Sequence, residues 1–263
     1  MVITSRDNDL IKHVRKLKEK KYREECKEFI IEGAKMIEEA IKEKANINTI
    51  IICDDCKTGE DCISNELMYE IAKFDCVYTD EKVFTSITDV VNPQGVMAIV
   101  EKPECEETNI DYKQDMFLIL DNIQDPGNMG TILRTVDSLN IKQIIISKDT
   151  TDIYSPKVVR ATMGAIFRVN VIEVDSIVKL IKDMKKHKIN VYATDLRTDQ
   201  NMYDIDYKKS AIIIGNEANG INEEILKAVD KKIRIPMVGK TESLNAAVAT
   251  GIILYEAFRE KLK

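Results

Sequence analysis

The sequence predicts an α/β protein whose larger part is a parallel sheet covered by helices. From Met116 onward, short apolar runs rich in β-branched residues alternate with stretches of helical periodicity. Near-continuous apolar strands separated by helices are typical of parallel sheets buried on both faces. The chain has 263 residues, 44% hydrophobic and 32% charged, which fits one large or two small globular domains.

Residues 1–100 form a first block in which helix and strand patterns alternate, and this block is expected to be a smaller α/β domain. Leu10, Ile11, Val14 and Leu17 recur at helical spacing, and Thr49–Cys53 is a β-branched run. The expected helices are residues 7–22, 33–45 and 65–74, and the expected strands are 49–53, 75–79 and 96–100.

Residues 101–115 are acidic and polar with one proline, and are expected to be a linker. Residues 116–263 then form the second domain. Its expected strands are 116–120, 143–147, 167–172, 190–194, 211–215 and 232–235. Its expected helices are 128–139, 155–163, 175–187, 222–229 and 243–262.

The net charge of −6 is unlike that of a protein that coats nucleic acid, so nucleic-acid binding would require a local basic patch. No apolar run approaches the ~20 residues that span a bilayer, which excludes a membrane protein. The N-terminus has no apolar signal region, so a cytoplasmic location is expected.

The scarcity of histidine limits the chemistry. Only His13 and His187 occur, and neither lies beside a glycine-rich turn. Cys53 and Cys56 have C-x-x-C spacing but lack the second paired element of a zinc site. We therefore expect neither a histidine-centred triad nor a metal site.

Three glycine-containing turns each follow an expected strand and open a helix. They are residues 120–134, 214–220 and 235–245. Open α/β sheets bind ligands at the carboxyl ends of their strands, where all three turns fall. In the third turn, Ser243-Leu244-Asn245 combines a helix-capping residue with a helix start of small residues.

Two common phosphate-binding motifs are excluded. Gly239-Lys240-Thr241 could end a P-loop, but Arg234 occupies the position of its first glycine. Gly127 and Gly130 have the last spacing of the dinucleotide fingerprint, but Asp125 replaces the first glycine. A kinase or a nucleotide-dependent oxidoreductase is therefore disfavoured.

Taken together, the three turns resemble the three motifs of the SpoU (TrmH-type) branch of the SPOUT RNA methyltransferases, in family order and spacing. The residues that carry the resemblance are Asp125-Pro126-Gly127-Asn128, Gly130 and Arg134, then Gly215, Glu217 and Gly220, then Ile235-Pro236-Met237, Gly239 and Ser243-Leu244-Asn245, and finally Leu254-Tyr255-Glu256. Phe29–Gly33 is similar to the start of the family's N-terminal substrate-binding domain, and Asn92–Val96 resembles the segment that joins this domain to the catalytic domain. One departure is Asn140, where many members have glycine, and asparagine tolerates the left-handed conformation expected there.

The resemblance implies a deep trefoil knot in the catalytic domain, S-adenosylmethionine as cofactor, and a homodimer formed by the C-terminal domain. It assigns methyl transfer to a ribose 2′-hydroxyl of RNA. The cofactor-binding residues that it implies are Thr194, Gly215, Ile235, Met237, Leu244 and Asn245. The catalytic residues that it implies are Arg134, Asn128, Glu217, Ser243 and Asn245.

Arg134 is expected to act on the RNA substrate. It would either take the 2′-proton or bind the target phosphate and stabilise the developing alkoxide. The clamp is preferred, because arginine remains protonated near neutral pH and a phosphate favours its charged form. Asn128 is expected to orient Arg134 or the ribose. Glu217 is expected to fix Arg134 or the third motif's backbone.

RNA binding is expected on the first helix, which is crowded with basic residues. The expected RNA-binding residues are Lys12, Arg15, Lys16, Lys20 and Arg23, with Arg160 extending the patch. An N-terminal domain of this type favours 23S ribosomal RNA as the substrate. The alternatives are a tRNA 2′-O-methyltransferase and a non-catalytic RNA-binding factor for ribosome assembly.

Overall fold

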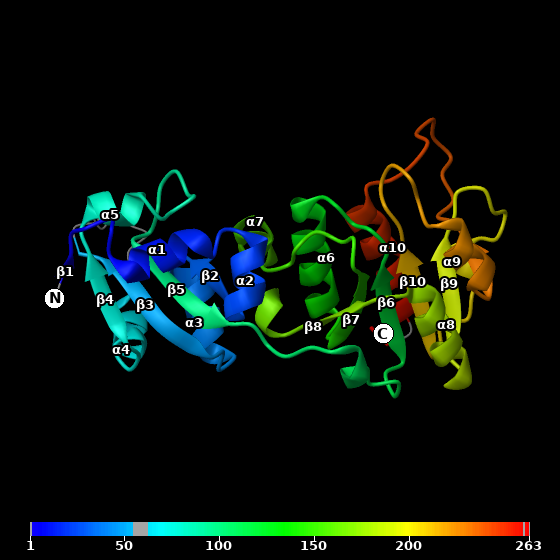
Figure 1. Ribbon diagram of the computed structural model, residues 1–263. Coiled ribbons are helices and arrows are strands. Elements are labelled where there is room, and N and C mark those ends of the chain that lie inside the picture. The colour runs from blue at the N-terminus through cyan, green and yellow to red at the C-terminus, as the bar shows by residue number, and fades with distance from the viewer. Residues whose placement is uncertain (1, 55–62, 260, 263) are drawn as a thin grey trace. The chain divides into compact units, whose positions relative to one another are not determined.

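A computed structural model describes residues 2–54, 63–259 and 261–262. The chain divides into two compact units (Figure 1). The first holds Met1–Pro103 and Asp152–Arg168, and the second holds Glu104–Thr151 and Val169–Lys263. The segment Asp152–Arg168 thus comes from the second half of the sequence but belongs to the first unit.

The first unit is built on a five-stranded mixed sheet in the order β1-β4-β3-β5-β2. Strands β3 and β4 are parallel, and β5 is antiparallel to both β3 and β2. The strands are β1 (Val2–Ile3), β2 (Glu28–Glu32), β3 (Ile47–Cys53), β4 (Cys76–Thr79) and β5 (Val96–Glu101). The helices are α1 (Asp9–Lys16), α2 (Lys20–Cys26), α3 (Ala34–Lys42), α4 (Asn65–Ile71), α5 (Glu81–Thr85) and α7 (Pro156–Thr162), with the 3₁₀ turn η2 (Ala165–Phe167).

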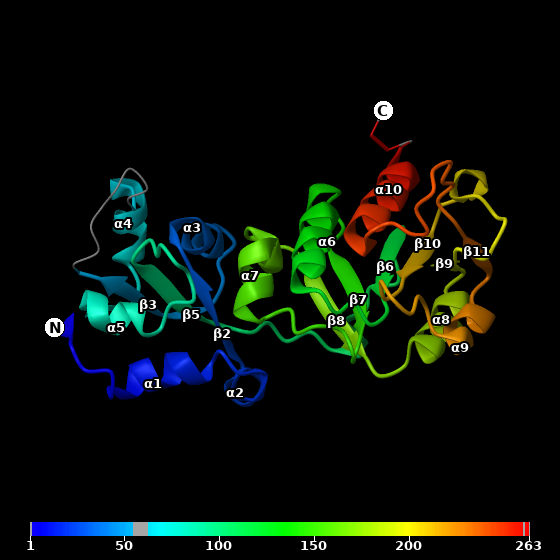
Figure 2. The ribbon, with the colours of Figure 1, turned by 90° about the horizontal axis from the view of Figure 1, so that it is seen from above.

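The helix expected over residues 7–22 is divided in two. Asn8 caps α1 by accepting a hydrogen bond from the Leu10 amide, and α1 ends at the buried Leu17. The carbonyl of Leu17 accepts a 2.6 Å hydrogen bond from Arg23, so the chain leaves the helical path before α2 begins. Helices α1 and α5 pack on one face of the sheet around Ile51 and Met97, while α3 and α4 lie on the other (Figure 2).

The second unit confirms the expected parallel sheet. Six strands lie in the order β11-β9-β10-β6-β7-β8, and every neighbouring pair is parallel. The strands are β6 (Met116–Leu120), β7 (Gln143–Ser147), β8 (Asn170–Val174), β9 (Asn190–Thr194), β10 (Ser210–Ile214) and β11 (Lys231–Ile233). The helices are α6 (Pro126–Ser138), α8 (Ile177–Lys186), α9 (Glu223–Ala228) and α10 (Ala246–Phe258), with the 3₁₀ turns η1 (Glu107–Asn109) and η3 (Met202–Asp204).

Helices cover both faces of this sheet. Helices α6 and α10 lie on one face and α8 and α9 on the other (Figure 2). The α8–α9 face packs on strand residues that include Phe117, Ile145 and Val191, all fully buried. All five residues of β6 and all five of β10 are buried, as expected for the central strands of such a sheet. No helix in the described part of the chain is long and apolar enough to span a membrane.

Several expected boundaries moved by one or more residues, and two of the shifts have a clear local reason. The strand expected at 167–172 begins at Asn170, because Gly164 (φ +95°) starts a 3₁₀ turn that ends at Phe167. The last helix begins at Ala246 instead of Ser243, because Asn245 is its N-cap. Asn140 adopts φ +56°, which confirms the left-handed conformation expected there.

Candidate functional site

A cavity of about 790 Å³ opens at the carboxyl ends of the strands in the second unit. Its walls come from the ends of β9, β10 and β11, from the turn after β10, and from the segment that leads into α10. The volume is within the range of small-molecule sites. Its apolar lining includes Ile214, Leu226, Ile233, Ile235, Met237 and Leu244, and its polar lining includes Asn216, Glu217, Glu242 and Ser243.

The structure gathers the residues expected to bind the cofactor. Thr194, Gly215, Ile235, Met237 and Leu244 all line the cavity. Asn245 lies between two lining residues, Leu244 and Ala246, without lining the cavity itself. The Thr194 hydroxyl donates a 3.2 Å hydrogen bond to the carbonyl of Ile213, which ties the end of β9 to β10.

Three side chains from three different turns form a hydrogen-bonded chain beside this cavity. The Asn245 amide donates to the Asn128 side-chain oxygen at 2.8 Å. The Asn128 amide in turn donates to Glu217 at 2.5 Å. Because Glu217 lines the cavity, the chain connects the first residues of α6 and α10 to the cavity wall. The three glycine-containing turns therefore meet at one place.

Asn245 is fixed by its capping of α10, so it can anchor the hydrogen-bonded chain to Asn128 and Glu217. Its side-chain oxygen accepts hydrogen bonds from the amides of Ala247 (3.0 Å) and Val248 (3.3 Å), which caps α10. Its side-chain NH₂ remains to bind Asn128. Asn245 thus fixes the start of α10 and orients Asn128 at the same time.

Asn216 has a structural role that the sequence reasoning missed. Its side-chain NH₂ donates to the carbonyl of Asn122 at 2.9 Å, and its oxygen accepts from the amides of Ala218 and Asn219. Its backbone exchanges two hydrogen bonds with Gly220. Asn216 therefore shapes the turn that carries Glu217. Asparagine beside glycine is a common turn signal and would have indicated this role.

Gly215 is required by close packing within this turn. A β-carbon built there would lie 2.5 Å from the Ile221 side chain and 2.6 Å from the Gly220 backbone. Backbone atoms cannot move aside easily, so any side chain would displace the turn from the cavity wall. Sequence reasoning assigned this glycine to a close approach of ligand, and the structure adds an internal reason.

Of the remaining catalytic candidates, Ser243 lies in the cavity lining and Arg134 on the exposed surface of α6. Ser243 lines the cavity and its carbonyl accepts a hydrogen bond from Thr241. Arg134 is exposed on α6, and within the described residues its side chain has no hydrogen-bond or ion-pair partner. Asn128 and Glu217 bind each other, and among the described residues no hydrogen bond or ion pair joins either of them to Arg134.

Charged groups surround the cavity rim. Arg197 forms ion pairs with Asp195 (3.0 Å) and Glu223 (2.8 Å), and these two carboxylates raise the pKa of its guanidinium. Asp121, at the end of β6, accepts a hydrogen bond from the Asn222 amide at 3.4 Å. Burial raises the pKa of the Asp121 carboxyl above its ordinary value.

The expected RNA-binding residues lie in the first unit, and most have free or partly free side chains. Lys12, Lys16 and Lys20 are exposed, and Lys16 lies over the ring of Tyr22 at 5.5 Å. Arg15 donates to the Ser86 hydroxyl. Arg160 lies on α7 and is partly exposed.

Arg23 requires a correction. Its side chain is 3% exposed, and its guanidinium binds Asp152 (2.5 Å and 3.0 Å) and the carbonyl of Leu17. A buried, fully paired guanidinium cannot grip an RNA phosphate. We therefore remove Arg23 from the RNA-contact set, because it stabilises the first unit by joining α2 to the segment before α7.

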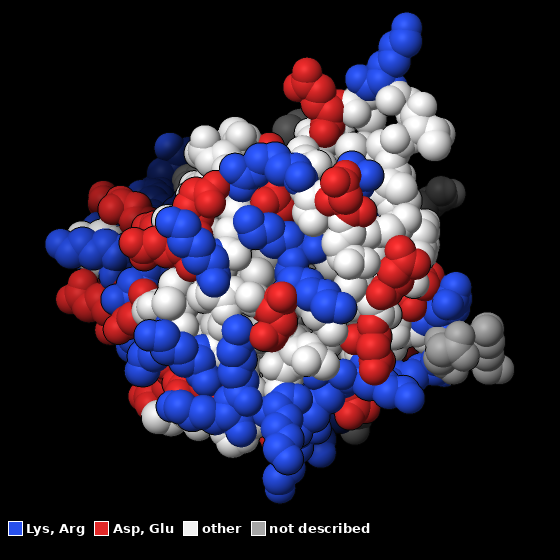
Figure 3. Space-filling model, turned by 90° about the vertical axis from the view of Figure 1, so that its right-hand side faces the viewer, with Lys and Arg blue, Asp and Glu red and all other residues white. Residues whose placement is uncertain are grey.

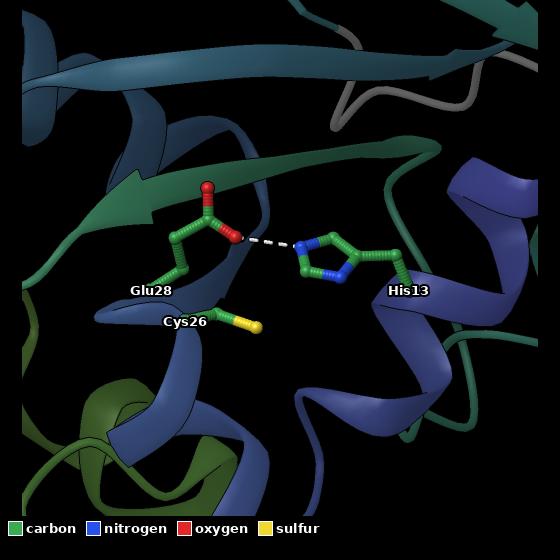
Figure 4. A group of neighbouring side chains, drawn as sticks. All are labelled: His13, Cys26 and Glu28. Atoms are coloured by element: carbon green, nitrogen blue, oxygen red, sulfur yellow. Dashed lines mark hydrogen bonds and ion pairs between the residues drawn. The ribbon is translucent and has the colours of Figure 1, made fainter.

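One group of metal-ligand side chains occurs among the described residues. The ligand atoms of His13, Cys26 and Glu28 lie within 4.8 Å of one another (Figure 4). His13 and Glu28 are already bonded to each other at 2.6 Å, and Asn48 donates to the other Glu28 oxygen. None of the three residues lines the cavity, so the group is no part of that site. Cys56, the second cysteine of the C-x-x-C spacing, lies outside the described residues.

Comparison with known proteins identifies two regions. Residues 115–255 match the SpoU rRNA Methylase family, and residues 8–98 match the MRM3-like substrate binding domain. The first match contains all three glycine-containing turns, and the second contains the basic helices α1 and α2.

Relatives match over nearly the whole chain. The 23S rRNA (guanosine(2553)-2′-O)-methyltransferase RlmP of Bacillus subtilis is 30% identical over 96% of this chain and 97% of its own. The AdoMet-bound rRNA methyltransferase from Sinorhizobium meliloti superposes with a TM-score of 0.85 at 32% identity, covering 100% and 99% of the two chains. A putative RNA methyltransferase of the TrmH family from Porphyromonas gingivalis gives 0.81 at 29% identity, covering 95% and 96%.

Proposed function

The chain belongs to the SpoU rRNA Methylase family, and from this premise we propose that it transfers a methyl group from S-adenosylmethionine to a ribose 2′-hydroxyl, with 23S ribosomal RNA as its substrate. The observation that carries the proposal is the hydrogen-bonded chain Asn245–Asn128–Glu217 beside the cavity. It holds side chains from three turns in one fixed arrangement, which a reaction governed by positioning needs.

The cavity suits the cofactor. S-adenosylmethionine would supply a methyl group activated by a positively charged sulfur. The apolar wall around Ile235, Met237 and Leu244 fits an adenosine, and the carboxylates of Glu217 and Glu242 bring negative charge to the lining. Thr194, Gly215 and Asn245 complete the residues that would hold it. Gly215 keeps the turn after β10 close enough to form the wall.

Arg134 acts on the acceptor side. Its exposed guanidinium has no partner in the described part of the chain, so it is free to bind a phosphate of the substrate. A bidentate contact there fixes the ribose, and the same positive charge stabilises the oxygen as it loses its proton. Ser243 and Asn128 lie near the junction of the three turns and help to place the sugar. Taking the 2′-proton is the alternative role for Arg134.

RNA recognition is assigned to residues 1–100, methyl transfer to residues 116–263 and the link between them to residues 101–115. Asp152–Arg168, which packs into the first unit, adds to RNA recognition. Lys12, Arg15, Lys16, Lys20 and Arg160 would contact phosphates. The match of residues 8–98 to a substrate-binding domain supports this assignment. The similarity to RlmP supports ribosomal RNA over transfer RNA.

A homodimer formed by the second unit is part of the proposal, as is the trefoil knot that the family resemblance implies. Val248, Ile252 and Tyr255 are 51%, 37% and 49% exposed on one face of α10. Apolar side chains at this spacing form a stripe that a second subunit would cover.

Mapping of alkali-resistant ribose linkages tests the reaction and the substrate together. Ribosomal and transfer RNA from cells with and without the gene would be compared nucleotide by nucleotide. Loss of protection at one 23S position supports the proposal, and loss at a tRNA position transfers the activity to tRNA. No lost position in either RNA, with S-adenosylmethionine still bound by the purified protein, would favour a non-catalytic assembly factor.

A further inference from the structure

A band of basic side chains runs from the cavity rim along the edge of the second unit's sheet. Figure 3 views the side of the molecule that carries α8 and α9, and Lys and Arg gather over much of it. Asp and Glu side chains lie among them on the same face (Figure 3). We define the basic band by its residues, which are Lys182, Lys227, Lys231, Lys232 and Arg234.

Three of these lysines lie close in sequence to the contacts that Lys185 makes. Lys185 donates to the carbonyl of Ala228 at 2.7 Å and pairs with Asp230 at 3.0 Å, which holds the end of α8 against the end of α9. Lys227 precedes Ala228, Lys231 follows Asp230, and Lys182 lies about one helical turn before Lys185. Lys227 and Lys231 thus flank in sequence the residues that Lys185 contacts, and Lys182 lies one turn away on the same helix.

These lysines are free to bind an anion. Lys182, Lys227 and Lys231 are exposed, and none has an ion-pair partner within the residues that the structure describes. By contrast, neighbouring Lys185 and Lys186 are paired with Asp230 and Asp183. Within the band, Lys232 lies 3.7 Å from Asp195 and Arg234 lies 3.5 Å from Asp199. The unpaired positive charge of the band therefore comes from Lys182, Lys227 and Lys231.

The band leads into the cavity along β11, the edge strand of the sheet. Lys231 and Lys232 begin the strand, and Arg234, directly after it, lines the cavity. The three steps from Lys231 to Arg234 span about 10 Å at ~3.3 Å per residue. A chain of phosphates lying on the band would thus end at the rim where the cofactor is proposed to bind.

We propose that the basic band binds the sugar-phosphate backbone of the substrate RNA at nucleotides that flank the target. This inference rests on the proposed function and adds a second RNA contact, on the methyltransferase unit itself. The contact is to phosphates and carries no base specificity. It adds phosphate contacts on the second unit to those on the first, and it directs the RNA strand toward the cavity.

The test compares two charge reversals of equal size in the full-length protein. The test variant is Lys182→Glu with Lys231→Glu. The control variant is Lys142→Glu with Lys148→Glu, at the two ends of β7. Strand β7 lies four positions from β11 in the sheet, which is about 19 Å at ~4.8 Å per strand. Each lowers the net charge by four, so a general repulsion would act on both.

Filter binding to a mixed-sequence 20-nucleotide RNA hairpin, over a series of salt concentrations, gives the readout. We expect the test variant to weaken binding about tenfold at 100 mM salt and to lower the slope of log K against log salt by about 1.5, because two phosphate contacts are lost. The control should change the affinity less than twofold. Equal weakening by both variants, or none by the test variant, would overturn the proposal and leave the lysines as protection for an exposed strand edge.

Calorimetry with S-adenosylmethionine separates this inference from the proposed function. Both variants should bind the cofactor as the wild type does, because neither changes a residue that lines the cavity. Failure of the wild type to bind it would refute the proposed function, whereas the hairpin measurements would still decide the role of the basic band.

Discussion

The side-chain amide of Asn245 donates a 2.8 Å hydrogen bond to the side-chain oxygen of Asn128, 117 residues earlier in the chain. The two residues open α10 and α6, and the bond holds the starts of both helices together. Asn128 passes the connection to Glu217 in the cavity wall. The site is therefore organised by amide side chains that satisfy one another, which fixes their orientation before any ligand binds.

A double-mutant cycle should reveal this coupling. Asn128→Ala and Asn245→Ser each remove the bond, and serine still caps α10. In urea unfolding we expect the double variant to lose about 0.5–1.5 kcal/mol less unfolding free energy than the sum of the two single losses. Once one change has removed the bond, the other has no bond left to break. Strict additivity would show that the two side chains do not interact in solution.

Replacement of Arg134 should separate binding from chemistry. Because Arg134 lies outside the cavity lining, Arg134→Ala should leave the S-adenosylmethionine affinity unchanged while lowering methyl transfer by about 10²–10³-fold. Calorimetry and transfer of a labelled methyl group to RNA measure the two effects. Equal loss of cofactor affinity would contradict the assignment to the acceptor side. Arg134→Lys, which keeps the charge without the bidentate geometry, should retain part of the activity.

Gly215 should resist any enlargement. Gly215→Ala would press its new methyl group against the Gly220 backbone and the Ile221 side chain. We expect a loss of about 1–3 kcal/mol in unfolding free energy, with weaker cofactor binding because the turn leaves the cavity wall. Gly239→Ala is the matched control, since nothing lies within 4 Å of the position that its β-carbon would take. Similar effects of the two changes would refute the packing argument.

The pH dependence of stability should carry the signature of Asp121. Burial raises the pKa of this carboxyl in the folded protein above its ordinary value of 3.8. Just above pH 4, the Asp121 carboxyl therefore keeps its proton in the folded state but loses it in the unfolded state. Its contribution to stability is present at low pH and is lost as pH rises above about 4. Asp121→Asn should flatten the fall in unfolding free energy over that range. An unchanged pH profile in the variant would show that Asp121 titrates normally.

Much of the second unit could be predicted because its residues obey local rules. The runs Met116–Leu120, Gln143–Ser147 and Asn190–Thr194 are strands with the expected bounds, since each is short, mostly apolar and followed by a charged residue. The cavity lining from Thr194 to Leu244 followed from the glycine-containing turns and the family resemblance. The confirmed left-handed Asn140 shows that one substitution of glycine by asparagine preserves a helix end.

The first unit was harder to predict because its structure depends on contacts between distant residues. Strand β2 was missed as a strand, although Glu28–Glu32 pairs with β5 along its length. The helix expected over 7–22 is interrupted where Arg23 reaches back to Leu17 and across to Asp152. A pairing between residues 129 positions apart leaves no periodic signal, so an arginine in a basic run looked like a surface residue.

Arg23 should therefore behave as a structural residue. Its guanidinium is buried and binds Asp152 through two nitrogens. Arg23→Ala leaves the carboxylate of Asp152, which is 12% exposed, without its partner, so we expect a loss of about 3–5 kcal/mol in unfolding free energy. Lys20→Ala, three residues earlier on the exposed surface of α2, should change stability by less than about 0.5 kcal/mol but weaken RNA binding. Urea unfolding and hairpin binding measure both variants. If Arg23→Ala retained full stability and lost RNA affinity in a salt-dependent manner, Arg23 would return to the RNA-contact set and the buried ion pair would be absent in solution.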